Sequence, residues 1–236
     1  MNRPFVVCHM ICSLDGKIDG EFMTVPQAKP ALQEYGKLRE FYQCQATLYG
    51  TTTMARSFSD GFAPELPSSE IKYPQEAYIS QSHENNYIVS IDPQGILGWS
   101  SNVIQKRGRS KAHVIEVLTE QTSPAYLAYL RQLDISYIFA GKTTIDCSLL
   151  LKKLKKLFQI ERLMIAGGAI VNWSFLQENL IDELSLVIAP VADGNTTSVS
   201  IFERSKFSAG KTPVSFQLKE VKRIAEDGLW LRYIVR

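Results

Sequence analysis

The stretch Glu161–Pro190, ERLMIAGGAIVNWSFLQENLIDELSLVIAP, decides the fold class that the sequence predicts. Its apolar start, RLMIAGG, indicates a buried strand that runs into two glycines, and AIVNWSFLQEN then indicates a short helix. The run ELSLVIAP indicates a second strand. A strand, a helix and a strand in this order are typical of a parallel sheet, and glycine at the first turn lets the backbone approach another molecule closely.

The rest of the chain continues this alternation. Further strands are predicted at FVVCHMIC, ATLYG, YIVSI, HVIEVL and SYIFAG. Pro30 fits the first turn of one helix, and TTTMARS predicts another with a threonine hydroxyl near its start, in the manner of an N-cap. Ser123 and Asp146 are predicted to cap the helices SPAYLAYLRQL and CSLLLKKLKKLF.

The C-terminal segment has a different pattern. VSFQLKEVKRI and LWLRYIV flank AEDG, and Asp227-Gly228 predicts a hairpin turn, so the sheet is expected to end in an antiparallel pair. The whole pattern predicts a single α/β domain over residues 1–236, with a mostly parallel central sheet. Residues 59–86 are polar and broken by prolines, which predicts a long surface loop that is either functional or an insertion.

Composition excludes several classes of protein. The 236 residues carry 26 basic and 24 acidic side chains, a formal charge of +2, whereas nucleic-acid-binding proteins usually show a clear basic excess. No apolar run reaches the length of a membrane span, and MNRPFVVCHM lacks the regions of a signal peptide. The four cysteines form no Cys-x-x-Cys pair and the three histidines lie far apart, so we expect a cytoplasmic protein with reduced thiols and no metal site.

The candidate binding residues lie at strand ends, because ligands of open α/β sheets bind beyond the carboxyl ends of the strands. Thr53 could reach a phosphate with its hydroxyl, or act only as a structural cap. Gly167 and Gly168 could bring the backbone against a pyrophosphate or a flat ring, or form only a tight turn. Ser90 and Asp92 end a strand, where Asp92 could accept from ribose hydroxyls or start a turn.

Charged residues on loops give further candidates. Asp15 and Lys17 follow the first strand and could hold a polar substrate, or could be the exposed charges of a turn. His9 is interpreted as a core histidine satisfied by hydrogen bonds. No nucleophile-elbow motif is present, so chemistry supplied by a bound cofactor fits the chain best.

In these motifs the chain resembles the reductases of riboflavin biosynthesis, the family of the RibD C-terminal domain and its stand-alone relatives. RPFVVCHMICSLDGKIDG is similar to the opening strand and Ser-Leu-Asp-Gly-Lys-Ile loop of that family, and ATLYGTTTMARS to its strand and threonine turn. The resemblance is strongest over ERLMIAGGAIVNWSFLQENLIDELSLVIAPVADG. It implies a dihydrofolate-reductase-like fold, with helices on both faces of the sheet.

The resemblance also implies the activity: reduction of a ribosylaminopyrimidine 5′-phosphate to its ribityl form with NADPH. It implies a homodimer that takes a small phosphorylated substrate. Asp15 and Lys17 would be catalytic residues on the substrate side. The cofactor would be bound by Thr53, Ser57, Ser90, Ile91, Ile145, Ala166, Gly167, Gly168, Ala169 and Ile170. QKRGRSK, residues 105–111, could meet a 2′-phosphate, or be an exposed basic loop.

The chain departs from the family at two places. Ala166–Ala169 reads Ala-Gly-Gly-Ala where the family has Glu-Gly-Gly-Gly, and SFSDGFAPEL replaces an Asp-Asp-Pro and arginine motif. Two alternatives therefore stay open beside the riboflavin reductase. One is a reductase of the same fold with another pterin-like or carbonyl substrate, and the other is a nucleotide-binding protein without activity.

Overall fold

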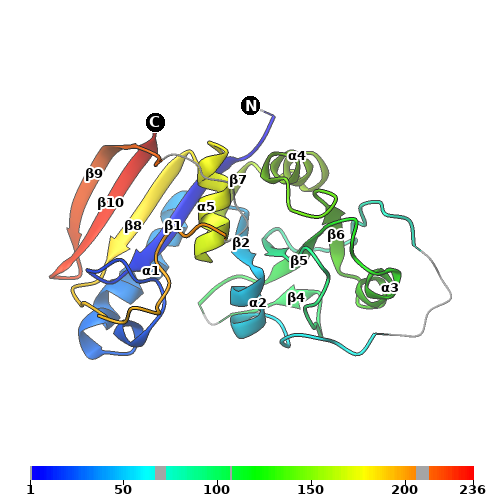
Figure 1. The fold of residues 1–236 in the computed structure, drawn as a ribbon, viewed down its shortest axis with the longest axis horizontal. Helices are drawn as coiled ribbons and strands as arrows, with labels where there is room; N and C mark the ends of the chain where they lie inside the picture. The colour runs from blue at the N-terminus through cyan, green and yellow to red at the C-terminus, as the bar shows by residue number, and fades with distance from the viewer. Residues whose placement is uncertain (1, 67–72, 107, 206–212) are drawn as a thin grey trace. The chain divides into compact units, whose positions relative to one another are not determined.

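The computed structural model describes residues 2–66, 73–106, 108–205 and 213–236 (Figure 1). Contacts between Cα atoms divide the chain into two compact units. The first unit holds residues 1–4 and 45–161, and the second holds residues 5–44 and 162–236. The prediction of one domain over residues 1–236 stays a prediction, and each unit is described by itself. Among the helices of the described residues, none combines the length and the hydropathy that a membrane span requires.

The first unit is built on a mostly parallel sheet. β2 (Ala46–Gly50) pairs with β3 (Tyr87–Ile91), and β3 pairs with β5 (Ala112–Leu118), both in parallel. The other edge of β5 pairs with β6 (Ser136–Phe139) in parallel and with β4 (Val103–Ile104) antiparallel. The two-residue strand β4 was not predicted, since so short a strand leaves no periodic pattern.

Three helices connect these strands: α2 (Thr51–Ser57), α3 (Pro124–Gln132) and α4 (Cys147–Phe158). The predicted caps of α3 and α4 are confirmed, since Ser123 accepts from the Tyr126 N–H and Asp146 from the Leu149 N–H. The predicted threonine cap of α2 is wrong. Gly50 is the N-cap residue, and no side chain of the described residues caps this helix. The Thr51 hydroxyl donates instead to the Ile91 carbonyl at 2.6 Å.

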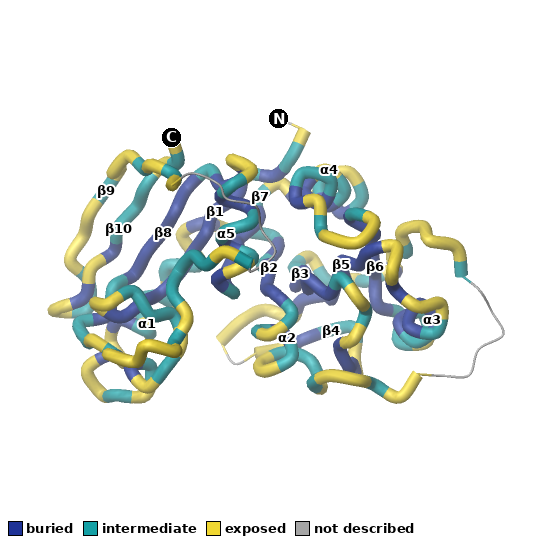
Figure 2. Tube along the Cα trace, viewed as in Figure 1, coloured by how far each residue is buried: buried dark blue, intermediate teal, exposed yellow. Residues whose placement is uncertain are grey.

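The second unit has a sheet of five strands in its described residues. β1 (Phe5–Cys12) lies between β7 (Arg162–Ile165) and β8 (Glu183–Ile188), parallel to both. β8 pairs antiparallel with β10 (Gly228–Val235), which forms the C-terminal hairpin with β9 (Phe216–Ile224). Figure 2 shows β1 and β8 buried and β9 largely exposed.

The hairpin turn differs from its prediction. Gly228 pairs with Ile224 and is the first residue of β10, so the turn is formed by residues 225–227. Ala225 and Glu226 take the positive φ angles of that turn, 47° and 65°. Gly228 is favoured for another reason, because a Cβ there would lie 3.1 Å from the Ile224 carbonyl oxygen, a tight contact with backbone.

Helices cover both faces of the second unit's sheet. α1 (Lys29–Tyr42) packs on the face that carries His9, and the centres of the His9 and Tyr35 rings are 4.5 Å apart in a stack. α5 (Ala169–Gln177) lies in front of the opposite face (Figure 1). Two short 3-10 helices, η1 (Glu21–Met23) and η2 (Pro26–Ala28), precede α1. The interpretation of His9 is confirmed: it is fully buried and bonds Ser185 Oγ and the Tyr35 carbonyl.

The long segment 59–86 contains no helix or strand in its described residues, and 67–72 lie outside them. Its start is held by a bond from the Ala63 N–H to the Ile96 carbonyl, at 2.9 Å. Its end pairs with β6, where Tyr78 and Tyr137 exchange two backbone hydrogen bonds of 2.9 Å. The Arg131 guanidinium lies over the Tyr78 ring at 3.9 Å. The described part of this loop therefore covers the outer edge of β6, whose other edge is paired with β5.

Candidate functional site

The glycine turn after β7 has the geometry of a site for close backbone approach. Gly167 has a φ of +114°, which L side chains rarely adopt, and a Cβ built there meets only Met10 Cε, at 3.8 Å. Gly168 has an ordinary φ of −47° and is the N-cap of α5, without a side-chain cap. Among the described residues no side chain caps the N–H groups of the first turn, so they can bind an anion at the positive end of the helix dipole.

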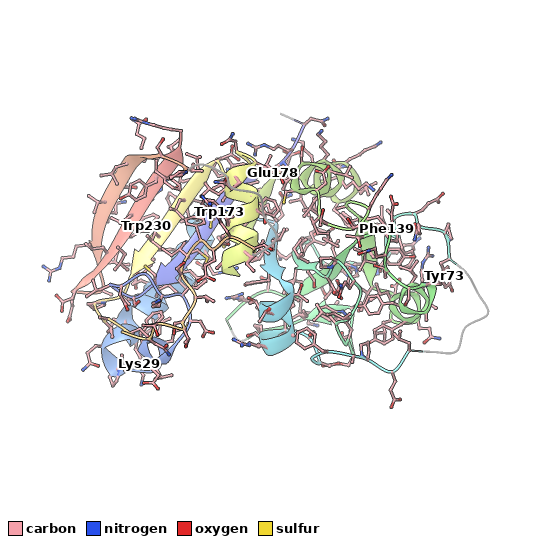
Figure 3. The ribbon with its side chains drawn as sticks, in the orientation of Figure 1. Lys29, Tyr73, Phe139, Trp173, Glu178 and Trp230 are labelled. Atoms are coloured by element: carbon pink, nitrogen blue, oxygen red, sulfur yellow. The ribbon has the colours of Figure 1, made fainter. Side chains whose placement is uncertain are left out.

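The neighbours of this glycine pair differ in exposure. Ala166 and Ala169 are buried, whereas Ile170 is 50% exposed on the first turn of α5. Trp173, labelled in Figure 3, lies on the next turn of α5. The Arg204 guanidinium is 5.3 Å from the centre of the Trp173 ring. The five predicted residues 166–170 are thus one continuous turn, with an apolar side chain at its surface and a backbone free of Cβ atoms at its bend.

The loop after β1 carries Asp15 and Lys17. The Asp15 carboxylate accepts the Ser13 hydroxyl at 2.5 Å and the backbone N–H groups of Asp193 and Gly194, each at 2.9 Å. These donors hold the pKa of Asp15 well below its ordinary value, with the Ser13 hydroxyl the largest cause. Asp15 is therefore a carboxylate at every physiological pH, which suits it to accept hydrogen bonds and not to donate a proton.

Residues 191–203, which we call the strap, connect the Lys17 loop to α5. The Lys17 ammonium donates to the Ser198 carbonyl at 3.1 Å, and the Ile18 N–H donates to the Val199 carbonyl at 3.0 Å. At the far end of the strap, the Asn172 amide donates to the Ile201 carbonyl at 2.8 Å, and the Glu203 N–H donates to the Ala169 carbonyl at 3.2 Å. The strap thus connects Asp15 and Lys17 to the helix that follows the glycine turn, all within the second unit.

Sequence reasoning missed the strap. No element and no role was predicted for VADGNTTSVSIFE. The signal that could have found it is topological: Cys12 pairs with Ile188, so the loops that follow β1 and β8 leave the sheet side by side.

The other predicted cofactor residues lie in the first unit. Thr53 is half-buried and Ser57 exposed on α2, and the Thr51 bond to Ile91 ties the start of this helix to the end of β3. Ser90 is fully buried and Ile91 nearly so. Ile145 lies elsewhere in the unit, half-buried in the loop between β6 and α4. The structure therefore groups Thr53 and Ser57 with the end of β3, and leaves Ile145 in a separate loop.

A basic loop contacts residues that flank α2 in the sequence. In residues 105–111 the Lys106 ammonium lies 5.1 Å from the centre of the Phe58 ring, and Arg109 donates to the Tyr49 hydroxyl at 2.9 Å. The rings of Tyr49 and Phe58 are themselves 4.5 Å apart. Arg107 lies outside the described residues. Two cations thereby contact the residues that precede and follow the helix that carries Thr53 and Ser57.

Two acidic side chains are buried in the core of the first unit. Glu116 on β5 pairs in register with Ser90 on β3, and its carboxyl makes no hydrogen bond to any described residue. Burial raises its pKa well above the ordinary value, and the charge of Asp92 raises it further. Asp92 is fully buried as well; it accepts from the N–H groups of Ile96 and Leu97 and from the Tyr126 hydroxyl. Asp92 therefore holds the loop after β3. The sequence left open ribose binding and the start of a turn as roles for Asp92, and this contact agrees with the second role.

The backbone groups at the glycine turn favour an organic anion as ligand. Within the described ranges, no group of three His, Cys, Asp or Glu side chains is placed to hold a metal ion. The bend at Gly167, which a Cβ would partly fill, and the uncapped N–H groups of α5 suit a phosphate or pyrophosphate instead. The residues present therefore fit the charged bridge of a dinucleotide.

The chain is similar to known proteins over nearly its whole length. The profile of the RibD C-terminal domain matches residues 4–229. The chain is 25% identical over 235 residues to the 2,5-diamino-6-ribosylamino-4(3H)-pyrimidinone 5′-phosphate reductase of Methanothermobacter thermautotrophicus, covering 99% of each protein. It is 28% identical over 219 residues to the reductase of the same name from Aquifex aeolicus, covering 93% of this chain and 91% of that protein.

Solved structures show the same fold. A pyrimidine reductase-like protein from Corynebacterium diphtheriae superposes with a TM-score of 0.70 at 16% identity, covering all of this chain and 93% of the other. RibD from Acinetobacter baumannii superposes with a TM-score of 0.64 at 22% identity. The chain spans 59% of the length of that RibD. The predicted dihydrofolate-reductase-like fold, mostly parallel with a C-terminal antiparallel hairpin, is confirmed.

Proposed function

The chain belongs to the RibD C-terminal domain family, and on that premise we propose that it is a reductase of riboflavin biosynthesis. The reaction converts a ribosylaminopyrimidine 5′-phosphate to its ribitylamino form. The observation that carries the proposal is the Gly167 turn, a backbone bend without a Cβ at the start of a helix whose first N–H groups are capped by no side chain of the described residues.

The proposed cofactor is a nicotinamide dinucleotide, which supplies a hydride when it is bound. In the second unit, the backbone of residues 166–170 would hold its pyrophosphate, and the exposed Ile170 would offer apolar contact. Considered separately, the Thr53 and Ser57 hydroxyls on α2 of the first unit are proposed as donors to phosphate or ribose oxygens of a nicotinamide dinucleotide. The protein contributes binding, orientation and the exclusion of water, and no covalent intermediate with the chain is required.

We propose NADPH as the preferred form of this cofactor. Discrimination between NADPH and NADH requires cations near a 2′-phosphate, and Lys106 and Arg109 supply two. Both contact aromatic residues that flank α2, Lys106 at the Phe58 ring and Arg109 at the Tyr49 hydroxyl. A loop fixed in this way loses less conformational freedom on binding than a free basic loop would.

On the substrate side, Lys17 is the proposed contact. Its ammonium has three N–H donors, and the Ser198 carbonyl takes one of them. The remaining donors suit a phosphate or a sugar hydroxyl of the substrate. Ala166 is buried where the family has a glutamate, and this apolar replacement favours a second candidate: reduction of another pterin-like or carbonyl substrate at the same cofactor site.

Two measurements test the proposal. Titration with NADPH and with NADH, followed by nicotinamide fluorescence, is expected to give saturable binding with tighter binding of NADPH. Incubation with the diamino and the deaminated ribosylaminopyrimidine phosphates is expected to oxidise NADPH with one of them, seen as a loss of nicotinamide absorbance. Binding without turnover of either substrate would remove the riboflavin assignment and favour the second candidate. No binding near millimolar cofactor would remove both and leave a protein without this activity.

A further inference from the structure

We infer that Asp15 and Asp193 are positioning residues: their carboxylates brace the loop after β1 against the strap, and the brace fixes the Lys17 ammonium relative to α5. The inference rests on the proposed function for its kinetic consequence. The brace itself lies entirely within the second unit and concerns the free protein.

The first half of the brace runs from the β1 loop to the strap. Both oxygens of Asp15 are used: Oδ1 accepts from the Asp193 N–H and Oδ2 from the adjacent Gly194 N–H, each at 2.9 Å. Hydrogen bonds from backbone N–H groups to a carboxylate are about twice as strong as neutral ones. The Ser13 hydroxyl, which also accepts from the Lys17 N–H at 2.9 Å, orients this carboxylate.

The second half runs in the opposite direction. Asp193 Oδ2 accepts from the Phe22 N–H at 3.1 Å, and the Phe22 side chain is buried, so the strap is tied to a fixed point. Gly20 makes this approach possible, because a Cβ on it would lie 2.5 Å from Asp193 Oδ2. The φ of Gly20, +141°, is also one that L side chains rarely adopt. Each loop thus supplies one carboxylate that the backbone of the other binds.

The brace ends at the residue that holds Lys17. Ser198 donates its hydroxyl to Asp193 Oδ1 at 3.4 Å, and the carbonyl of the same Ser198 accepts from the Lys17 ammonium at 3.1 Å. From there the strap continues to the bonds with Asn172 and Ala169 on α5. Displacement of the strap would therefore move the ammonium and its carbonyl partner together, relative to the glycine turn.

Asp15 acts through the strap and not as an acid. Its carboxylate is occupied by three donors and stays ionised, so it has no proton to deliver to a substrate. A residue with this role changes how tightly the substrate is held, whereas loss of a proton donor changes the rate of the chemical step and its pH profile.

The test compares Asp15→Asn and Asp193→Asn with the control Asp227→Asn, which removes an exposed carboxylate of the same unit that pairs with Arg223. Amide hydrogen exchange is followed in the free protein at Phe22, Asp193 and Gly194. We expect both brace variants to exchange at least about tenfold faster at these amides, because an amide oxygen binds N–H groups less strongly than a carboxylate. The control is expected to exchange as the parent protein does.

Kinetics supply the second readout. We expect the KM for the phosphorylated substrate to rise by about tenfold in each brace variant, the KM for NADPH to stay within about twofold, and the pH profile of kcat to keep its shape. If either variant folds poorly, Ser13→Ala removes one bond to Asp15 and is expected to give the same pattern to a smaller extent.

Unchanged exchange at all three amides in Asp15→Asn would overturn the inference, as would loss of kcat with an altered pH profile while exchange stays at the parental rate. The exchange result decides the brace even if the parent protein turns over neither pyrimidine phosphate. A failed riboflavin assignment and a failed brace are therefore distinguishable.

Discussion

At the scale of single residues, the two glycines of the turn after β7 have different backbone conformations. Gly167 takes a φ of +114°, whereas the φ of Gly168 is −47°, an angle open to any residue. The sequence could predict that one of the pair was required, because the dipeptide follows an apolar strand. It could not predict which, because φ depends on where β7 and α5 are placed by the rest of the sheet.

This difference gives a prediction for stability. Gly167→Ala is expected to lower the free energy of unfolding by roughly 1–2 kcal/mol, because an L residue in that backbone region is strained. It is also expected to weaken NADPH binding, because the Cβ enters the space proposed for the pyrophosphate. Urea unfolding and fluorescence titration measure the two effects. Gly168→Ala is the matched control for stability, and an equal loss of stability in both variants would contradict the role assigned to Gly167.

The buried Glu116 gives a prediction for pH dependence. Because burial raises its pKa, the folded chain keeps the proton at pH values where the unfolded chain, with an ordinary pKa of 4.5, releases it. The unfolded state then binds fewer protons, so stability falls as the pH rises above about 4.5 toward the folded pKa. Glu116→Gln cannot ionise, and we expect it to be more stable than the parent near neutral pH and similar to it below the ordinary pKa.

Urea unfolding across that pH range measures this difference. The variant leaves unchanged the side chains that face Glu116, namely Ser90, Trp99, Tyr126 and Asp92. Glu161→Gln, which changes an exposed side chain of the same unit, is expected to show no such pH dependence. A Glu116→Gln variant that is less stable than the parent at neutral pH would mean that the buried carboxyl stabilises the fold in its charged form.

At the scale of elements, α2 shows how a local signal can be assigned to the wrong residue. Three consecutive threonines made a threonine cap the natural prediction, yet the N-cap is Gly50 and Thr51 is bonded to β3. A capping preference considers only a residue and the three that follow it. The Ile91 carbonyl, 40 residues away, competes for the same hydroxyl and is brought there by the pairing of β2 with β3.

Separate roles for the threonines of α2 follow from this geometry. Thr51→Val is expected to cost about 1 kcal/mol of stability, because it leaves the Ile91 carbonyl without this donor. Its effect on NADPH affinity is expected to be small. Thr53→Val is expected to keep the stability and weaken NADPH binding, because its hydroxyl is a proposed cofactor contact. Thermal unfolding and fluorescence titration compare the two, and the reverse pattern would exclude Thr53 as a contact.

At the scale of the whole molecule, the exposed face of the C-terminal hairpin suggests how two copies could associate. Leu218, Val221 and Leu229 lie on one face by their register and are 51%, 55% and 38% exposed. β9 pairs only with β10 among the described strands, so its outer edge is open (Figure 2). We propose this face as the contact of a homodimer, since exposed aliphatic groups next to an open edge are typical of association sites.

Val221→Lys places a charge in the middle of that face. We expect it to shift the protein from dimer to monomer at micromolar concentration, measured by light scattering after size exclusion. Gln217→Lys places the same charge on the other face of the hairpin and is expected to leave the dimer intact. A parent protein that is monomeric at every concentration, or a Val221→Lys variant that stays dimeric, would contradict the proposed contact.

The sequence by itself determined the order and type of nearly all strands and helices, the caps of α3 and α4, and the glycine turn. These features depend on residues that lie within a few positions of one another, because they follow from the periodicity of apolar side chains and the preferences of cap residues. They were enough to indicate an α/β sheet with its site at the strand ends.

Only the tertiary structure decided that Asp15 braces the strap, that Thr51 bonds β3 and that Glu116 is buried among polar groups. Asp15 and Gly194 are 179 positions apart in the chain, and they meet because β1 and β8 are neighbours whose carboxyl ends open on the same edge of the sheet. Such a contact depends on which strands pair and in what register, and no local pattern around either residue contains that information.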